Sequence, residues 1–64
     1  MNYYIKERHN PQLGIYYVPY GQLTKKYAKE SVNAIYGENR MLEFNTKEAY
    51  ENKIDELRKA GKLA

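Results

Sequence analysis

The 64-residue chain has no cysteine, no tryptophan, one histidine and only two prolines. Without cysteine it can form neither a disulfide framework nor a thiolate metal site, the usual reinforcements of chains this short. Its four glycines stand alone at positions 14, 21, 37 and 61. The sequence therefore also lacks a glycine-rich loop able to cradle a phosphate.

Groups suited to catalysis are scarce as well. A general base, a nucleophile or a metal centre needs several polar side chains that converge on one point. The single histidine, His9, falls in or beside a predicted turn, where an exposed loop residue explains it. Glu48, Glu51 and Asp55 share a predicted helix face, which is typical of a solvated surface rather than of a cation site. We expect no enzyme, no catalytic residue, no metal and no cofactor.

Long apolar runs are missing too. No stretch approaches the roughly 20 apolar residues that a membrane-spanning helix needs. The first six residues, MNYYIK, lack the basic, apolar and small-residue pattern of a secretion signal. The sequence therefore predicts a cytoplasmic protein without a membrane partner.

Tyrosine is abundant instead, with eight copies in the chain. A tyrosine buries a large ring while its hydroxyl keeps a polar partner, which suits a domain that buries only about 60% of its unfolded surface. We expect residues 1–64 to form one domain. The net charge is +3, and the excess lies in residues 1–36, which hold five basic and two acidic residues. Residues 37–64 hold six of each and are balanced.

The pattern of residue types predicts an α+β fold with the order ββαβα. Residues 3–8 and 14–18 are rich in Tyr, Ile and Val and are separated by a turn that contains Asn10 and Pro11, which indicates a β-hairpin. Pro19 cannot donate a ladder hydrogen bond, so the second strand should end near Val18. Residues 40–44 form the third predicted strand, with Leu42 and Phe44 on one face.

Two amphipathic helices are predicted. Thr24 can cap a helix over residues 25–36, and Gly37 can stop it. Asn45 opens the second helix in a capping-box-like arrangement with Glu48, and Gly61 ends it. We expect a three-stranded antiparallel sheet with both helices packed on one face, which leaves the other face in water. The competing arrangement places one helix on each face.

The outer face of the hairpin is the first candidate binding surface. Tyr3 and Ile5 are expected to point toward the helices, so the alternation of a strand directs the neighbouring side chains outward. The exposed set is then aromatic and basic: Tyr4, Lys6, Arg8, Tyr16 and Val18. Tyr and Arg anchor protein interfaces, and the same mixture can stack on bases and contact phosphates. The alternative is that the tyrosines only shield the sheet.

A second candidate lies at the start of the first helix. Lys25 and Lys26 stand at the positive end of the helix dipole, where positive charge is unfavourable. Together with Thr24 and Lys29 they are chemically able to hold a phosphate or carboxylate, although solvated surface lysines explain the pattern equally. Lys53 projects into the apolar stripe of the second helix, where its stem is expected to pack along the core edge.

These features indicate a non-enzymatic binding module. The first hypothesis is a small protein-interaction protein of the regulatory or inhibitory kind, which binds an unidentified protein or a second copy of itself through the hairpin edge. The alternative is a nucleic-acid-binding module that uses the same face and the basic start of the first helix. The mild net charge favours the protein partner.

Overall fold

The computed structural model describes residues 1–30 and 39–64. The elements follow the order β1 (Asn2–Asn10), β2 (Gly14–Leu23), α1 (Lys25–Glu30), β3 (Asn39–Phe44) and α2 (Lys47–Lys59). The α+β class, the three-stranded antiparallel sheet and the two helices are confirmed. The rest of the first predicted helix, to residue 36, and its stop at Gly37 lie outside the described residues.

The sheet has the strand order β2-β1-β3, so β1 is the central strand. It pairs with β2 through the hairpin and with β3 through a longer connection, both antiparallel. The register places Ile5 beside Leu42 and Tyr3 beside Phe44, so Leu42 and Phe44 share the face predicted for them. Ile5 is fully buried at the centre of the sheet.

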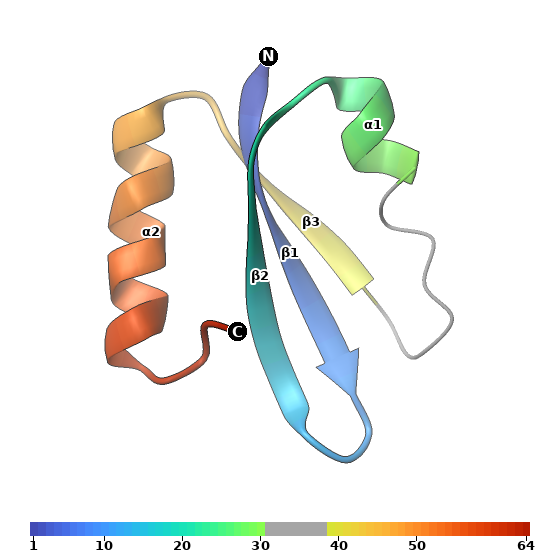
Figure 1. The fold of residues 1–64 in the computed structure, drawn as a ribbon, viewed down its shortest axis with the longest axis vertical. Helices are drawn as coiled ribbons and strands as arrows, with labels where there is room; N and C mark the ends of the chain where they lie inside the picture. The colour runs from blue at the N-terminus through green and yellow to red at the C-terminus, as the bar shows by residue number, and fades with distance from the viewer. Residues whose placement is uncertain (31–38) are drawn as a thin grey trace.

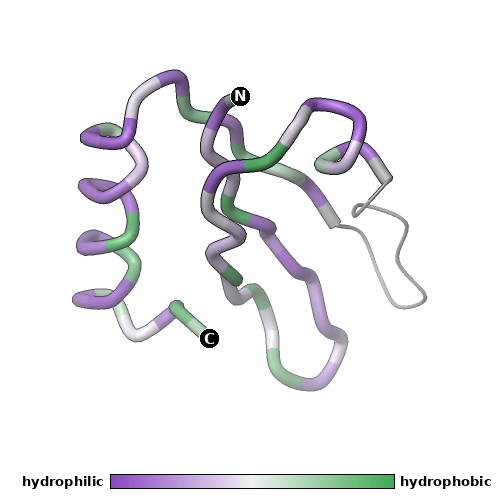
Figure 2. The backbone as a smooth tube through the Cα atoms, turned by 45° about the horizontal axis from the view of Figure 1, so that its top comes forward, coloured by the Kyte–Doolittle hydropathy of each residue, from purple (hydrophilic) through white to green (hydrophobic). Residues whose placement is uncertain are grey.

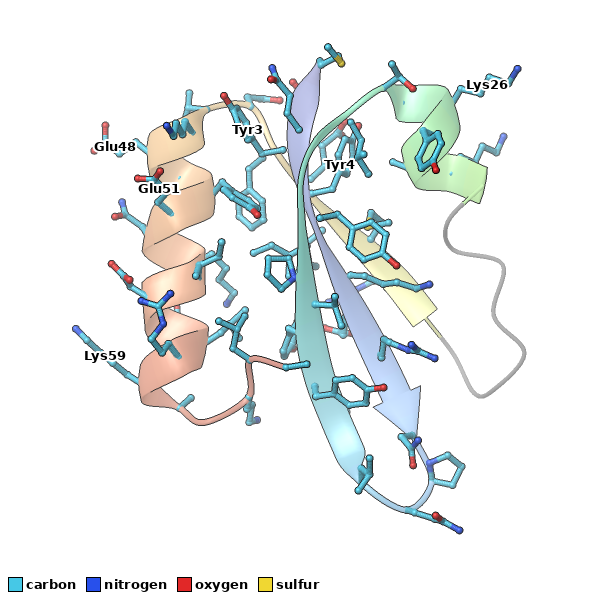
Figure 3. The ribbon with its side chains drawn as sticks, in the orientation of Figure 1. Tyr3, Tyr4, Lys26, Glu48, Glu51 and Lys59 are labelled. Carbon is cyan, nitrogen blue, oxygen red and sulfur yellow. The ribbon has the colours of Figure 1, made fainter. Side chains whose placement is uncertain are left out.

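The two helices lie on opposite sides of the sheet, which Figure 1 shows with the strands between α2 and α1. The expectation that both helices pack on one face is therefore wrong, and the competing arrangement is correct. The physical reason lies in the strand alternation of β1: Tyr3 points toward α2 and Tyr4 toward α1 (Figure 3). Both faces of β1 carry rings that need cover, and each helix covers one of them.

The second strand runs through Pro19 to Leu23, so the predicted end near Val18 is wrong. Pro19 pairs with Ile5, and the register shifts between Tyr4 and Ile5, which leaves Tyr20 without an opposite residue in β1. Because β2 is an edge strand, the missing N–H of Pro19 can face outward, where no ladder partner is lost. Gly21 follows with a φ of 73°, a conformation that favours glycine.

The cap of α2 is Thr46 and not Asn45. The Thr46 hydroxyl accepts a hydrogen bond from the backbone N–H of Ala49 at 3.2 Å. The predicted end of the helix at Gly61 is confirmed, because Gly61 has a φ of 70° directly after the last helical turn. The backbone N–H groups of Gly61 and Lys62 donate to the carbonyls of Arg58 and Leu57, which is the Schellman pattern.

The buried apolar residues belong to both sides of the sheet. Ile5 and Leu57 lie on the side of α2, whereas Tyr4 lies on the side of α1, where Ala28 is also buried. On the α2 side the ring of Tyr50 contacts those of Tyr3 and Phe44, with centroids 5.4 and 6.3 Å apart. In Figure 2 the hydrophobic part of α2 faces the strands and its outer side is hydrophilic. Neither described helix has the length and hydrophobicity that crossing a bilayer requires.

Candidate interaction face

The predicted alternation of β1 brings Tyr4, Lys6 and Arg8 to the same side of the sheet, the side on which α1 lies (Figures 1 and 3). The register adds Tyr16 opposite Arg8 and Val18 opposite Lys6. Five residues that are spread over 15 positions in the sequence therefore lie on neighbouring strands. This grouping agrees with the sequence analysis. The difference is that α1 lies on this side of the sheet, which was expected to be left in water.

Two contacts between a cation and a ring organise this side of the sheet. The Arg8 guanidinium carbon lies 5.8 Å from the centroid of the Tyr16 ring, and the Lys6 ammonium lies 5.8 Å from that of Tyr20. Cations at this distance are attracted by the negative face of a ring, and the contact restrains both side chains. Arg8, Tyr16 and Val18 are half-buried and Tyr20 is 37% exposed. We call these four residues the interaction face.

Tyr4 and Lys6 lie beneath this face rather than on it, since their exposed fractions are 4% and 7%. The Tyr4 hydroxyl donates to Oε2 of Glu43 at 2.6 Å, and the same oxygen accepts from the Asn2 amide at 2.9 Å. The expectation that this side of the sheet is left in water is wrong, because α1 lies on it. Tyr20, which no candidate set included, takes the accessible position instead.

The hydrogen bond between Tyr4 and Glu43 perturbs both groups. It raises the pKa of the Tyr4 hydroxyl, with burial and the nearby charge of Glu43 acting in the same direction. It also lowers the pKa of the Glu43 carboxyl, together with the Asn2 hydrogen bond and the charge of Lys25, while burial acts in the opposite direction. Glu43 therefore places a negative charge on the same side of the sheet as Arg8.

The start of α1 holds the second candidate set. The Thr24 hydroxyl caps the helix, since it accepts from the backbone N–H of Tyr27 at 3.2 Å. Thr24, Lys25, Lys26 and Lys29 are all exposed, and Lys26 points away from the sheet in Figure 3. A hollow next to the cap is lined by Thr24 and Lys25 and also by the Glu43 carboxylate. A bound anion would meet that negative charge, which makes the position less favourable than the sequence indicates.

The opposite side of the sheet contains a charged cluster that sequence reasoning missed. Glu7 is only 7% exposed, and its carboxylate is bonded to side chains from all three strands. Oε1 lies 2.7 Å from His9 Nε2, while Oε2 accepts from the Tyr17 hydroxyl at 2.9 Å and from the Arg40 guanidinium at 3.1 Å. His9 lies beside the turn, as one of the two predicted positions has it, but it belongs to β1 and to this network and not to the loop.

The network sets the ionisation of Glu7. Hydrogen bonds from His9 first, then from Tyr17 and Arg40, hold the pKa of the Glu7 carboxyl below its usual value, against the effect of burial. Burial raises the pKa of the Tyr17 hydroxyl, and the hydrogen bond to Glu7 raises it further. Glu7 is therefore a fully bonded carboxylate that ties three strands together. Within the described residues no group of acidic or histidine side chains is arranged to hold a metal ion.

Lys53 lies where the sequence predicted it, at the margin of the α2 stripe. Its side chain is about one-third exposed at 32%, and its ammonium contacts Glu56 at 3.3 Å. A shallow hollow beside it is lined by Glu7, Tyr17 and Arg40 among others. The contact with Glu56 is an exposed ion pair within the helix, so it contributes little to binding or stability.

Comparison of the chain with protein-family models, with curated proteins and with solved structures finds no match in any of the three. Two features were missed by sequence reasoning. Tyr20 could have been found only from the register shift between Tyr4 and Ile5, and the Glu7 cluster only from the register of all three strands.

Proposed function

We propose that this chain is a small, non-enzymatic protein-binding module that docks its partner on the interaction face. The observation that carries the proposal is the pair of contacts that Arg8 makes with Tyr16 and Lys6 with Tyr20, both at 5.8 Å. Each contact favours one position of a partly accessible tyrosine before a partner arrives. Aromatic side chains that are ordered in advance lose little conformational entropy on binding, which is typical of interface anchors.

The charge distribution favours a protein over nucleic acid. Lys6 is 7% exposed, so its ammonium is poorly placed to contact a phosphate. Glu43 adds an exposed carboxylate on the same side of the sheet, and Lys25 stands near it. A nucleic-acid surface needs an excess of accessible positive charge, because phosphate contacts supply most of the affinity. The interaction face has mixed charge instead, as the polar rims of protein interfaces do.

Tyr16, Val18 and Tyr20 are the expected anchors. They follow one another along β2 on the same side of the sheet, and Arg8 borders them on β1. The arrangement provides two rings and a branched aliphatic side chain next to one guanidinium. Tyr and Arg are enriched among the residues that carry most of the energy of protein interfaces, so a partner with a complementary apolar pocket and an acidic rim fits this face.

The test compares partner capture by immobilised wild-type protein and by Tyr16→Ala, with Lys59→Ala as the matched control. Lys59 points away from the sheet on α2 in Figure 3. Circular dichroism and urea unfolding first establish that the variants are folded. The proposal expects Tyr16→Ala to lose at least tenfold in affinity for the captured protein, about 1.4 kcal/mol, while Lys59→Ala binds as the wild type does. Equal binding by all three proteins would exclude the interaction face.

A further inference from the structure

The outer edge of β2 already holds a short additional strand, which the chain supplies itself. The Tyr17 N–H donates to the Lys62 carbonyl at 2.8 Å, and the Ala64 N–H donates to the Tyr17 carbonyl at 2.8 Å. Leu63 thereby forms a parallel bridge with Tyr17. We call residues 62–64 the tail. Gly61 turns the tail back after α2, and Figure 1 shows its end beside β2.

Residues 62–64 pair with one position of this edge, Tyr17. Alternate residues of a strand direct both backbone polar groups to the same side, so Ile15 and Pro19 face outward as Tyr17 does. Pro19 offers a carbonyl alone, whereas Ile15 offers both an N–H and a carbonyl. Among residues 1–30 and 39–64, none pairs with the outward backbone groups of Ile15, and its side chain is 47% exposed. The edge can therefore accept a longer strand than the tail.

The edge lacks one usual protection against pairing with another chain, which is charge. Native edge strands commonly carry charged side chains, because charge prevents two edges from associating. No Asp, Glu, Lys or Arg occurs between Arg8 and Lys25, so the whole of β2 is uncharged. The chain has a net charge of +3, but the β2 strands of two copies can approach each other without repulsion between facing charges.

We propose that the β2 edge is a self-association site at which a second copy of this chain adds its own β2, and that the tail guards the site. A two-fold axis normal to the sheet makes the two strands antiparallel and keeps equivalent faces on the same side. With Tyr16 opposite its counterpart, Ile15 of each copy faces Tyr17 of the other. The N–H and carbonyl groups of both residues are then all used.

This register keeps Pro19 away from Ile15 and Tyr17 of the second copy. A ladder centred on Tyr17 would instead place Pro19 opposite Ile15, where its missing N–H leaves a gap. It also places the two Tyr16 rings side by side, and aromatic pairs across strands are stabilising. The inference rests on the proposed function, because the dimer would join two copies of the interaction face into one surface. The tail must leave Tyr17 before the second copy can pair, so its two hydrogen bonds compete with association.

The test is sedimentation equilibrium of the full chain as wild type, Ala64→Pro and Ala64→Gly. Proline removes the N–H that bonds to Tyr17, while glycine keeps that N–H and serves as the matched control. The inference expects Ala64→Pro to dimerise at least about tenfold more tightly than the wild type, since each copy loses one competing hydrogen bond. Ala64→Gly should behave as the wild type does. Adding Ile15→Lys to Ala64→Pro should restore the monomer.

Amide hydrogen exchange identifies the surface used. The Ile15 amide should exchange rapidly in the monomer and become protected in proportion to the dimer. Equal association of the wild type and Ala64→Pro, the absence of association in both, or a dimer in which the Ile15 amide stays unprotected would each overturn the inference. Such a result leaves the proposed function standing, because capture through Tyr16 is measured on a chain whose tail is intact.

Discussion

The hydroxyl of Tyr17 donates a 2.9 Å hydrogen bond to Oε2 of Glu7, the residue directly opposite it on β1. The same oxygen accepts from Arg40 on the third strand. A carboxylate that is nine-tenths buried is thus satisfied by groups from every strand. A buried charge that keeps all of its partners is tolerated, whereas the loss of one partner leaves a group that neither protein nor water satisfies.

Tyr17→Phe removes one donor from Glu7 and keeps the ring. We expect the free energy of unfolding to fall by about 1.5–3 kcal/mol, the range for hydrogen bonds to charged groups. Urea unfolding followed by circular dichroism measures the change. Tyr16→Phe, on the other side of the sheet, is the matched control and should change stability by less than about 0.5 kcal/mol. Equal effects of the two variants would show that the Glu7 cluster carries no special stability.

Stability should fall in acid because of Glu7. Its pKa in the folded protein lies below its usual value of 4.5, so the folded state binds the proton less tightly than the unfolded state. The stabilisation is therefore complete above about pH 4.5 and is lost as the pH falls toward the pKa of the folded state. Glu43 contributes in the same direction. The midpoint of urea unfolding should decrease over this window, and less steeply in Glu7→Gln.

Thr46, and not Asn45, should be sensitive to substitution at the start of α2. Thr46→Ala removes the acceptor for the Ala49 N–H and should destabilise the protein by about 1 kcal/mol. Asn45→Ala should change the free energy of unfolding by less than about 0.5 kcal/mol. Thermal unfolding of the two variants under the same conditions shows which residue is the cap. A larger loss of stability in Asn45→Ala would contradict Thr46 and identify Asn45, the residue that the sequence predicted.

Ile5 should tolerate substitution poorly, since it is fully buried at the centre of the sheet on the side of α2. Ile5→Val deletes one methylene and should cost about 0.5–1.5 kcal/mol, which leaves enough folded protein to measure. Ile15→Val removes the same group from a side chain that is 47% exposed and should cost less. A comparable loss at both positions would argue against a core centred on β1.

The sequence predicted the elements well where local chemistry determines them. The hairpin, the third strand and the end of α2 at Gly61 follow from turn residues and hydrophobic alternation, and the structure has them. The strand alternation of Tyr3 and Tyr4 was also predictable. The face that each helix covers was not, because the alternation of β1 gives two faces that are both rich in tyrosine and equally able to receive a helix.

The errors arise where tertiary position overrides a local rule. A proline would end a central strand, but it is tolerated on an edge strand. β2 is an edge strand because β3 pairs with β1 and not with β2. The sequence analysis does not single out Glu7, because only the register of the three strands brings Tyr17 and Arg40 to its carboxylate. Neither fact can be inferred without knowing the order of the strands in the sheet.

The central claim is that the interaction face binds a protein and does not bind nucleic acid. The most direct test is an amide-resolved NMR titration of the labelled protein with short single- and double-stranded DNA and RNA at about 50 and 200 mM salt. We expect no shifts at Arg8, Tyr16 or Lys25 at either salt concentration. Shifts that cluster at these residues at low salt and shrink at high salt would contradict the claim and assign the face to nucleic acid.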